Sequence, residues 1–183
     1  VLECNWKVFV ENYLDGGMHV PYIHGGLSSQ LAYSTYKTEC FENFSIQSVK
    51  ASKGENSSGI DFNERIGEGA LYTFLYPNFM INRYGRWMDI NYIFPLGHSR
   101  TEVIFDYFFD QRNMDSLEPD FVEKSLKASD LVQQEDIWIC ESVQRGLGST
   151  AYQKARGRYA PKVEHALHHF HSLLNRDISQ VLK

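Results

Sequence analysis

Two histidines and a carboxylate are spaced so that this chain could bind a metal ion. His19 and His24 lie on either side of Pro21. In an unbroken helix, five residues would leave the two imidazoles about 140° apart, so they would not converge. A bend at Pro21 would bring them together, because proline ends a regular helix. The pair is a candidate for metal binding, and two ordinary structural histidines are the alternative.

Asp136 is the candidate for a third ligand. It lies in the middle of a predicted inward-facing helical stripe, built from steps of three and four residues: Ser125, Ser129, Val132, Asp136, Ile139, Cys140 and Val143. A carboxylate on such a face must be paired, protonated or bound to a metal. A buried salt bridge, or a position at the edge of the stripe, is the alternative.

Two histidines and one carboxylate form the facial ligand set of non-haem Fe(II) oxygenases. This set leaves positions open for dioxygen and substrate. Zinc uses the same types of ligand, so these residues alone leave the metal open. His24 and Asp136 are far apart in the sequence, so the fold must bring the third ligand to the other two.

The predicted elements come in an order that could do this. Residues 5–24 predict a short helix followed by a break, and residues 25–32 predict a connecting loop. Alternation around residues 44–49 predicts a first strand, and the further predicted strands are 70–76, 79–84, 87–94 and 101–109. Turns are predicted at 82–86 and 95–99. Such short spacing favours an antiparallel meander.

After the strands, the hydrophobic period changes to that of a helix. Residues 117–143 predict one long helix with Pro119 in its first turn, ended by the segment 145–148. A last helix is predicted over 161–174. The fold class is therefore α+β, an antiparallel sheet with a long helix packed on it. With 183 residues, the chain is expected to be a single domain.

The composition excludes some classes of partner. Eighteen basic and 23 acidic residues give a net charge of −5, which argues against binding to nucleic acid or to an anionic membrane. Three cysteines without a Cys-x-x-Cys pair give no disulfide framework, so a soluble, intracellular protein is expected. Aromatic residues make up 14% of the chain, typical either of a β-rich core or of a pocket for an apolar or cationic ligand.

Longer motifs resemble the catalytic domain of Rieske-type non-haem iron oxygenases. Asn5-Trp6-Lys7, Glu11-Asn12 and the two histidines resemble its opening, and ED at 135–136 with CESVQRGL at 140–147 resembles its closing ligand motif. The segments YPNFMINRYG at 76–85, RYA at 158–160 and HHFH at 168–171 resemble the choline monooxygenase branch in particular. The resemblance covers nearly the whole chain and implies a helix-grip, START-like catalytic fold.

The resemblance also implies roles for individual residues. His19, His24 and Asp136 would bind mononuclear Fe(II), with Asn12 near the iron. Asp15 would conduct the electron that arrives from the Rieske cluster of a neighbouring subunit. The common family pattern has this acid three residues ahead of the first histidine, where this chain has Gly16, and Asp15 lies four ahead.

The implied reaction is oxidation of a methyl group of a quaternary ammonium substrate by dioxygen, choline giving betaine aldehyde. Ring faces would hold the trimethylammonium group. The candidate rings lie on predicted strands, and each could equally be core: Trp87, Tyr92, Phe94 and Tyr107. The alternatives are a related oxygenase that demethylates glycine betaine or carnitine, and a non-catalytic helix-grip domain that binds a small ligand. A zinc hydrolase would need a general base beside the ligands, and none is apparent.

A Rieske [2Fe-2S] cluster needs Cys-x-His and Cys-x-x-His pairs, and Cys4, Cys40 and Cys140 form none. The cluster is therefore expected on an N-terminal domain absent from this chain, and the chain alone is expected to be inactive. Electrons would come from a ferredoxin or a reductase. The family also implies a trimer for the full-length protein, in the chloroplast stroma of a plant or otherwise in the cytoplasm.

Overall fold

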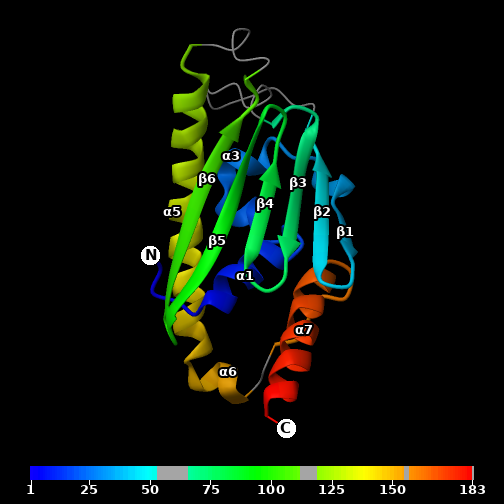
Figure 1. The fold of residues 1–183 in the computed structure, drawn as a ribbon, viewed down its shortest axis with the longest axis vertical. Coiled ribbons are helices and arrows are strands. Elements are labelled where there is room, and N and C mark those ends of the chain that lie inside the picture. Colours follow the sequence, from blue (N-terminus) through cyan, green and yellow to red (C-terminus); the bar gives the residue numbers. More distant parts are fainter. Residues whose placement is uncertain (53–65, 112–118, 155–156, 183) are drawn as a thin grey trace.

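A six-stranded antiparallel sheet lies at the centre of the molecule (Figure 1). The computed structural model describes residues 1–52, 66–111, 119–154 and 157–182. The strands follow one another across the sheet in chain order: β1 (Lys37–Cys40), β2 (Phe44–Lys50), β3 (Gly69–Leu75), β4 (Phe79–Arg83), β5 (Trp87–Gly97) and β6 (Arg100–Phe109). The predicted meander is confirmed. The sequence does not predict β1, because this short strand is mostly exposed and carries no apolar alternation.

Helices lie behind the sheet in the view of Figure 1, with the long α5 running beside β6. In chain order the helices are α1 (Trp6–Leu14), α2 (Val20–Ile23), α3 (Gly25–Ser28), α5 (Phe121–Leu147), α6 (Thr150–Lys154) and α7 (His165–Val181). A 3-10 turn, η1 (Tyr33–Thr35), leads into β1. The predicted α+β architecture, with a long helix against an antiparallel sheet, is confirmed.

Several predicted boundaries are wrong for reasons visible in the pairing. Asn82, predicted to lie in a turn, is a paired residue of β4 opposite Asp89. The turn predicted at 95–99 is occupied as far as Gly97 by β5. Proline is tolerated there because the pairing of β4 with β5 does not extend past Tyr92, so Pro95 has a strand partner on one side only.

The long helix is shifted relative to its prediction. It begins at Phe121, so Pro119 lies in the turn before it, and it continues four residues past Val143 to Leu147. Gly146 costs the helix only about 1 kcal/mol relative to alanine. Leu147 packs against the main core, which favours continuation of the helix. Val143 is exposed, so it does not belong to the inward stripe.

The last helix is displaced as well. α7 begins at His165 and ends at Val181, later at both ends than the predicted 161–174, because residues 161–164 form a turn. The segment 25–32, predicted as a loop, includes the single-turn helix α3. The predicted start of the long helix at residue 117 falls outside the described residues.

The main core lies between the inner face of the sheet and the helices. Its buried residues come from the N-terminal segment with α1, from β3 to β5, from α5 and from α7: Leu2, Cys4, Val8, Phe9, Val10, Leu14, Phe74, Met80, Ile93, Cys140, Ala166 and Phe170. Phe170 packs edge-on against Phe74 and Trp6, so α7 is tied to both the sheet and α1. This core fixes α1 and α5 relative to each other.

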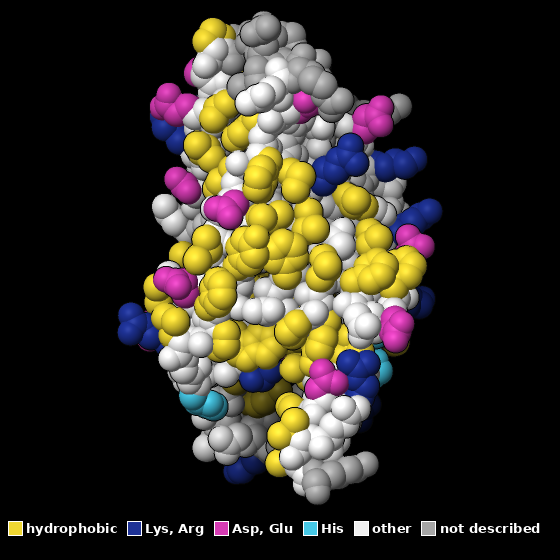
Figure 2. All heavy atoms as spheres, in the orientation of Figure 1, with side chains coloured by type: hydrophobic (Ala, Val, Ile, Leu, Met, Phe, Trp, Pro, Cys, Tyr) yellow, Lys and Arg dark blue, Asp and Glu magenta, His cyan; other side chains and the backbone are white. Residues whose placement is uncertain are grey.

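The other face of the sheet is exposed and strongly apolar (Figure 2). Its exposed large side chains include Phe44, Leu71, Leu75, Phe94, Ile104 and Phe108. Strand register places Phe44, Leu75, Phe79, Tyr92 and Ile104 in one row across this face. None of the described helices is long and apolar enough to cross a membrane.

Candidate metal centre

The bend between α1 and α2 places the two histidines at either end of a single helical turn. Gly16 and Gly17 both have φ of +73°, a conformation that favours glycine. His19 directly precedes α2 and His24 directly follows it. Pro21 lies in the first turn of α2, where proline fits. The prediction that Pro21 breaks the helix is therefore wrong, because α2 runs through Pro21 and ends just before His24, while the two glycines bend the chain ahead of His19.

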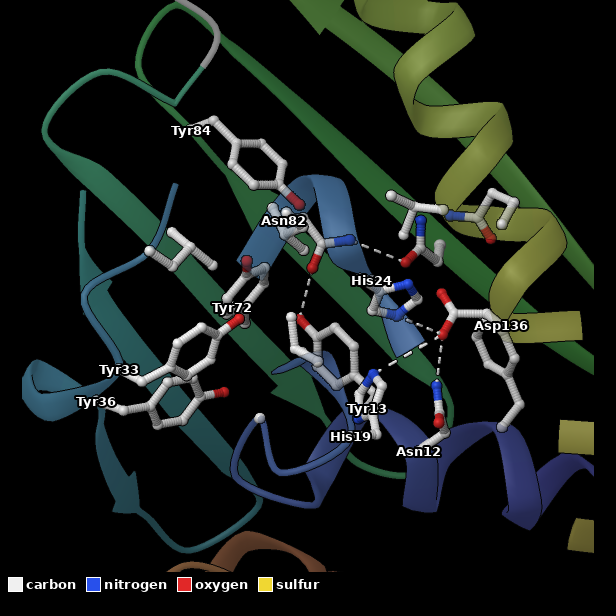
Figure 3. Close-up of a pocket in the computed structure, with 18 of the residues that line it drawn as sticks. Asn12, Tyr13, His19, His24, Tyr33, Tyr36, Tyr72, Asn82, Tyr84 and Asp136 are labelled. Atoms are coloured by element: carbon white, nitrogen blue, oxygen red, sulfur yellow. Dashed lines mark hydrogen bonds and ion pairs between the residues drawn. The ribbon is translucent and has the colours of Figure 1, made fainter. Parts of the chain in front are cut away.

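His19, His24 and Asp136 come together as predicted (Figure 3). Nε2 of His24 lies 3.2 Å from Oδ1 of Asp136, and Nε2 of His19 lies 3.9 Å from the same oxygen. The three ligand atoms all lie within 4.8 Å of one another. The exposed fractions of the side chains are 17% for His19, 2% for His24 and 13% for Asp136. Across the described ranges, this is the one group of three with metal-binding geometry.

Each histidine is oriented by a second carboxylate. Nδ1 of His19 lies 2.8 Å from Oδ2 of Asp15, and Nδ1 of His24 lies 2.7 Å from Oε2 of Glu135. A carboxylate on Nδ1 fixes the ring so that Nε2 is free for a metal. Glu135 is missing from the site predicted from the sequence, although its place beside Asp136 was a usable signal. Adjacent helical residues point about 100° apart, so one acid can bind metal while the next reaches the back of an imidazole.

Asn12 and the surrounding charges complete the centre. Nδ2 of Asn12 donates to Oδ1 of Asp136 at 2.7 Å, which holds that carboxylate from the side of α1.

Burial would lower the pKa of His24, but its contacts with Asp136 and Glu135 outweigh burial, so the pKa is raised. Burial, with Asp136 second, raises the pKa of the Cys140 thiol, which stays protonated in the core.

The donor set fits Fe(II). Two imidazole nitrogens and one carboxylate oxygen converge from α2 and α5, and the cavity described below borders all three residues. This is the ligand set of the non-haem Fe(II) oxygenases, with open positions for exogenous ligands. Asp15 and Glu135, which contact Nδ1 of the two histidines, supply the hydrogen-bond partners that metal-binding histidines usually have.

A cavity of about 100 Å³ adjoins the three candidate ligands. It is smaller than the cavity of roughly 150 Å³ that binds benzene, so its volume limits a ligand to a small molecule. Aromatic rings supply much of its wall, namely Phe9, Tyr13, Tyr33, Tyr36, Tyr72, Tyr84 and Phe105. No lysine or arginine is among the described lining residues. Tyr33 and Tyr36 lie on the side of the cavity away from Asp136 (Figure 3).

The tyrosine hydroxyls stay protonated. Burial is the largest cause that raises the pKa of Tyr13, Tyr33 and Tyr36. The hydroxyl of Tyr36 donates to Oε1 of Gln47 at 3.1 Å. The hydroxyl of Tyr33 is buried and has no hydrogen-bond partner within the described part of the chain. Buried polar groups are nearly always paired, so this hydroxyl points to a bound ligand or an ordered water.

The four aromatic residues predicted to hold the substrate lie elsewhere, outside the described lining of the cavity. Tyr92 and Phe94 stack on each other, and both alternate with the inward-facing Asn91 and Ile93, so they belong to the outer face of the sheet. Trp87 faces inward but is buried between Tyr84 and Phe109. Tyr107 stacks beside Trp87. Alternation showed which rings share a face, but not which face borders the cavity.

Comparison with known proteins gives a consistent assignment. The family "Ring hydroxylating alpha subunit (catalytic domain)" matches residues 1–180. A chloroplastic choline monooxygenase of Arabidopsis thaliana is 54% identical over 179 residues, which are 97% of this chain and 40% of the relative. A carnitine monooxygenase oxygenase subunit of Escherichia coli K12 is 29% identical, covering 93% of this chain and 46% of the relative. The chain thus spans less than half the length of these relatives.

Solved structures share the fold. A quaternary ammonium Rieske monooxygenase in complex with an inhibitor superposes with a TM-score of 0.76 at 24% identity, over 96% of this chain and 47% of that one. Dicamba monooxygenase bound to dicamba gives a TM-score of 0.70 at 18% identity, over 97% and 57% of the two chains. The expected fold of an oxygenase catalytic domain is confirmed.

Proposed function

We propose, since this chain belongs to the ring-hydroxylating alpha subunit (catalytic domain) family, that it is the mononuclear-iron part of a Rieske-type monooxygenase that oxidises choline to betaine aldehyde. One observation carries the proposal: a facial group of His19, His24 and Asp136 borders a small, tyrosine-lined cavity. The high identity to choline monooxygenases supports the choice of substrate.

The residues of this chain would prepare the site for the reaction. His19, His24 and Asp136 would hold Fe(II), which supplies dioxygen activation when bound. Asp15 and Glu135 accept from the two histidines and turn both Nε2 atoms toward the metal position. Asn12 keeps the Asp136 carboxylate in place. The apolar walls limit water at the reacting carbon.

The chemistry of choline determines which carbon must lie at the metal. Betaine aldehyde keeps all three methyl groups of choline on nitrogen, so the oxidised group is the CH2OH group, and the expectation of methyl oxidation does not hold for this substrate. One atom of dioxygen enters a C–H bond of that carbon, and the other leaves as water, with two electrons and two protons supplied. The resulting aldehyde hydrate then loses water. Methyl oxidation belongs to the alternative, N-demethylation.

The cavity favours choline over substrates that carry a carboxylate. Glycine betaine and carnitine bear an anion that needs a cationic or donor-rich partner. The described lining offers no lysine or arginine, and the tyrosine rings suit a trimethylammonium group. The rings of Tyr33 and Tyr36 lie away from Asp136 (Figure 3). We therefore expect them to hold the trimethylammonium group, with the CH2OH group toward the metal position.

The electron supply lies outside these 183 residues in our proposal. A [2Fe-2S] Rieske cluster on another domain, reduced by a ferredoxin or reductase, would deliver electrons through Asp15 of a neighbouring subunit in a trimer. Asp15 supports this role because it contacts His19 and is 17% exposed. A quaternary ammonium Rieske monooxygenase of known structure, which shares the fold, gave insights into inter-subunit electron transfer. The names of the plant relatives favour the chloroplast stroma as the compartment.

Product analysis with the full-length, iron-loaded protein and a ferredoxin system tests the function. Choline, glycine betaine and carnitine are supplied in parallel, and both betaine aldehyde and formaldehyde are quantified. Betaine aldehyde from choline, without formaldehyde, supports the proposal. Formaldehyde from any of the three substrates would identify a demethylase instead. Saturable choline binding without turnover would favour a ligand-binding domain.

A further inference from the structure

The inner face of the sheet contains a buried carboxylate that the proposed reaction does not use. Asp89 on β5 is 4% exposed and lies outside the described lining of the cavity. Its Oδ2 accepts hydrogen bonds from Nδ2 of Asn82 at 2.7 Å and from Nδ2 of Asn91 at 2.8 Å. Asn82 lies directly across from Asp89 on β4, and Asn91 is two residues further along β5, so all three share a face.

The Asp89 carboxylate fixes the orientation of the amide groups of Asn82 and Asn91. A carboxylate accepts but does not donate, so both amide NH2 groups must face Asp89. The second N–H of Asn82 donates to Oδ1 of Asn91 at 3.0 Å, and Oδ1 of Asn82 accepts from the hydroxyl of Tyr13 at 2.7 Å. Exchanging the nitrogen and oxygen of either amide would set an oxygen against the carboxylate.

Asn82 and Asn91 themselves line the cavity. Both N–H groups of Asn82 are engaged, one by Asp89 and one by Asn91, so the group that Asn82 has left for the cavity is its carbonyl oxygen, which keeps a second lone pair. Asn91 uses one N–H for Asp89, and its oxygen accepts from Asn82. The neighbouring lining consists of tyrosine rings, whose faces are also electron-rich. The part of the cavity wall formed by Asn82 and these rings therefore suits a cation and disfavours an anion.

We infer that Asp89 is a positioning residue that makes this cavity selective for cations, by fixing the amide of Asn82 so that both of its N–H groups are engaged and its oxygen is left for the ligand. The inference rests on the proposed function only in taking choline as the cation. Asp89 does not contact the ligand, so it acts through the two amides and through the field of its own charge. An N–H of Asn82 in place of this oxygen would direct a positive partial charge at the trimethylammonium group.

Two ligands of the same shape isolate this effect. Choline is compared with its neutral carbon isostere, an alcohol in which a tert-butyl group replaces the trimethylammonium group. Binding of each is measured by calorimetry to the full-length, iron-loaded protein under anaerobic conditions, with tetramethylammonium as a third probe. The wild type is expected to prefer choline. In Asp89→Asn, choline affinity is expected to fall about tenfold, as for loss of a hydrogen bond to a charged group, while the isostere binds unchanged.

Asp106→Asn is the matched control, because Asp106 is an exposed carboxylate on the outer side of the neighbouring strand β6. It should retain the wild-type ratio of affinities. If Asp89→Asn fails to fold, Asn91→Leu provides the test, because it removes one amide oxygen and keeps Asp89. Choline should then bind more weakly and the isostere should not.

The binding results test the cation selectivity independently of whether the protein oxidises choline. Wild-type protein that binds both ligands equally, or an Asp89→Asn ratio equal to wild type, overturns it. A protein that binds none of the three probes overturns it as well. A protein that prefers choline but does not oxidise it would contradict the proposed function and leave the cation selectivity supported.

Discussion

Glu135 and His24 are 111 positions apart in the sequence, yet Oε2 of Glu135 lies 2.7 Å from Nδ1 of His24. The contact joins α5 to the end of α2 and fixes the ring of the more deeply buried histidine. Asp15 contacts His19 in the same way from within the bend. With Asn12, which donates to Asp136, the candidate metal centre therefore has six side chains whose orientation is coupled, three of them candidate ligands.

Replacing Glu135 with alanine should weaken Fe(II) binding about 10- to 100-fold, because the His24 ring loses the group that orients it. Anaerobic titration with Fe(II) measures this. Glu123→Ala on the same helix is the control, since Glu123 is exposed and pairs only with Lys127 among the partners described. Equal iron affinity of Glu135→Ala and wild type would show that the contact does not orient the ring.

Asp15→Asn tests the electron path in protein that is fully loaded with iron. The amide keeps one acceptor oxygen, which can serve the main-chain N–H of Met18, but it loses the second oxygen that faces the main-chain N–H and Nδ1 of His19. Iron affinity should therefore fall, as for Glu135→Ala, and in the loaded protein reoxidation of the reduced Rieske cluster in a single turnover should slow about a hundredfold. Stopped-flow absorbance of the cluster follows this step. Unchanged reoxidation would exclude Asp15 from the electron path.

Tyr33→Phe should affect stability and binding in opposite directions. The Tyr33 hydroxyl is buried without a described partner, so removing it should leave the free energy of unfolding unchanged or raise it by up to about 1 kcal/mol. Choline should bind more weakly if the hydroxyl faces the ligand. Tyr36→Phe, which loses the bond to Gln47, should instead be destabilised by about 1 kcal/mol. Urea unfolding and calorimetry of both variants provide the comparison.

Gly16→Ala should disturb the bend that places His19. Its φ of +73° costs a non-glycine residue about 1–2 kcal/mol, and an added Cβ would collide with the main chain at Val163. Both stability and iron affinity should fall. Gly25→Ala is the matched control beside His24, since nothing lies within 4 Å of its added Cβ. Similar losses in the two variants would mean that general destabilisation, and not the bend, explains the result.

The sequence predicts the ligands better than their surroundings. The types and order of the residues make His19, His24 and Asp136 candidates, the resemblance to the oxygenases implies that they bind iron, and the structure brings them together. Strand alternation separates the two faces of β5 correctly, but a pattern of period two does not say which face borders a cavity. The predicted rings Tyr92 and Phe94 therefore lie on the outer face, while the tyrosines that line the cavity come from β3, η1 and the ends of neighbouring elements.

Long-range contacts account for the remaining difference. The pairing of Glu135 with His24, and the hydrogen bond from Tyr13 to Asn82, depend on how α5 and β4 pack against segments far away in the sequence. Local propensity contains no information on such contacts. The misplaced break at Pro21 has a different origin, because proline fits the first turn of a helix as well as it ends one, and here it lies in the first turn of α2.

The most direct test of the central claim is anaerobic Fe(II) binding, measured on wild type, His19→Ala and Asp136→Ala. The electron paramagnetic resonance signal of the nitric oxide adduct reports mononuclear Fe(II) separately from any cluster. Our account predicts a single such iron per chain in the wild type, lost in both variants, with unfolding curves that show folded protein in all three. Iron binding that survives either substitution in a folded protein would contradict the assignment of the metal centre.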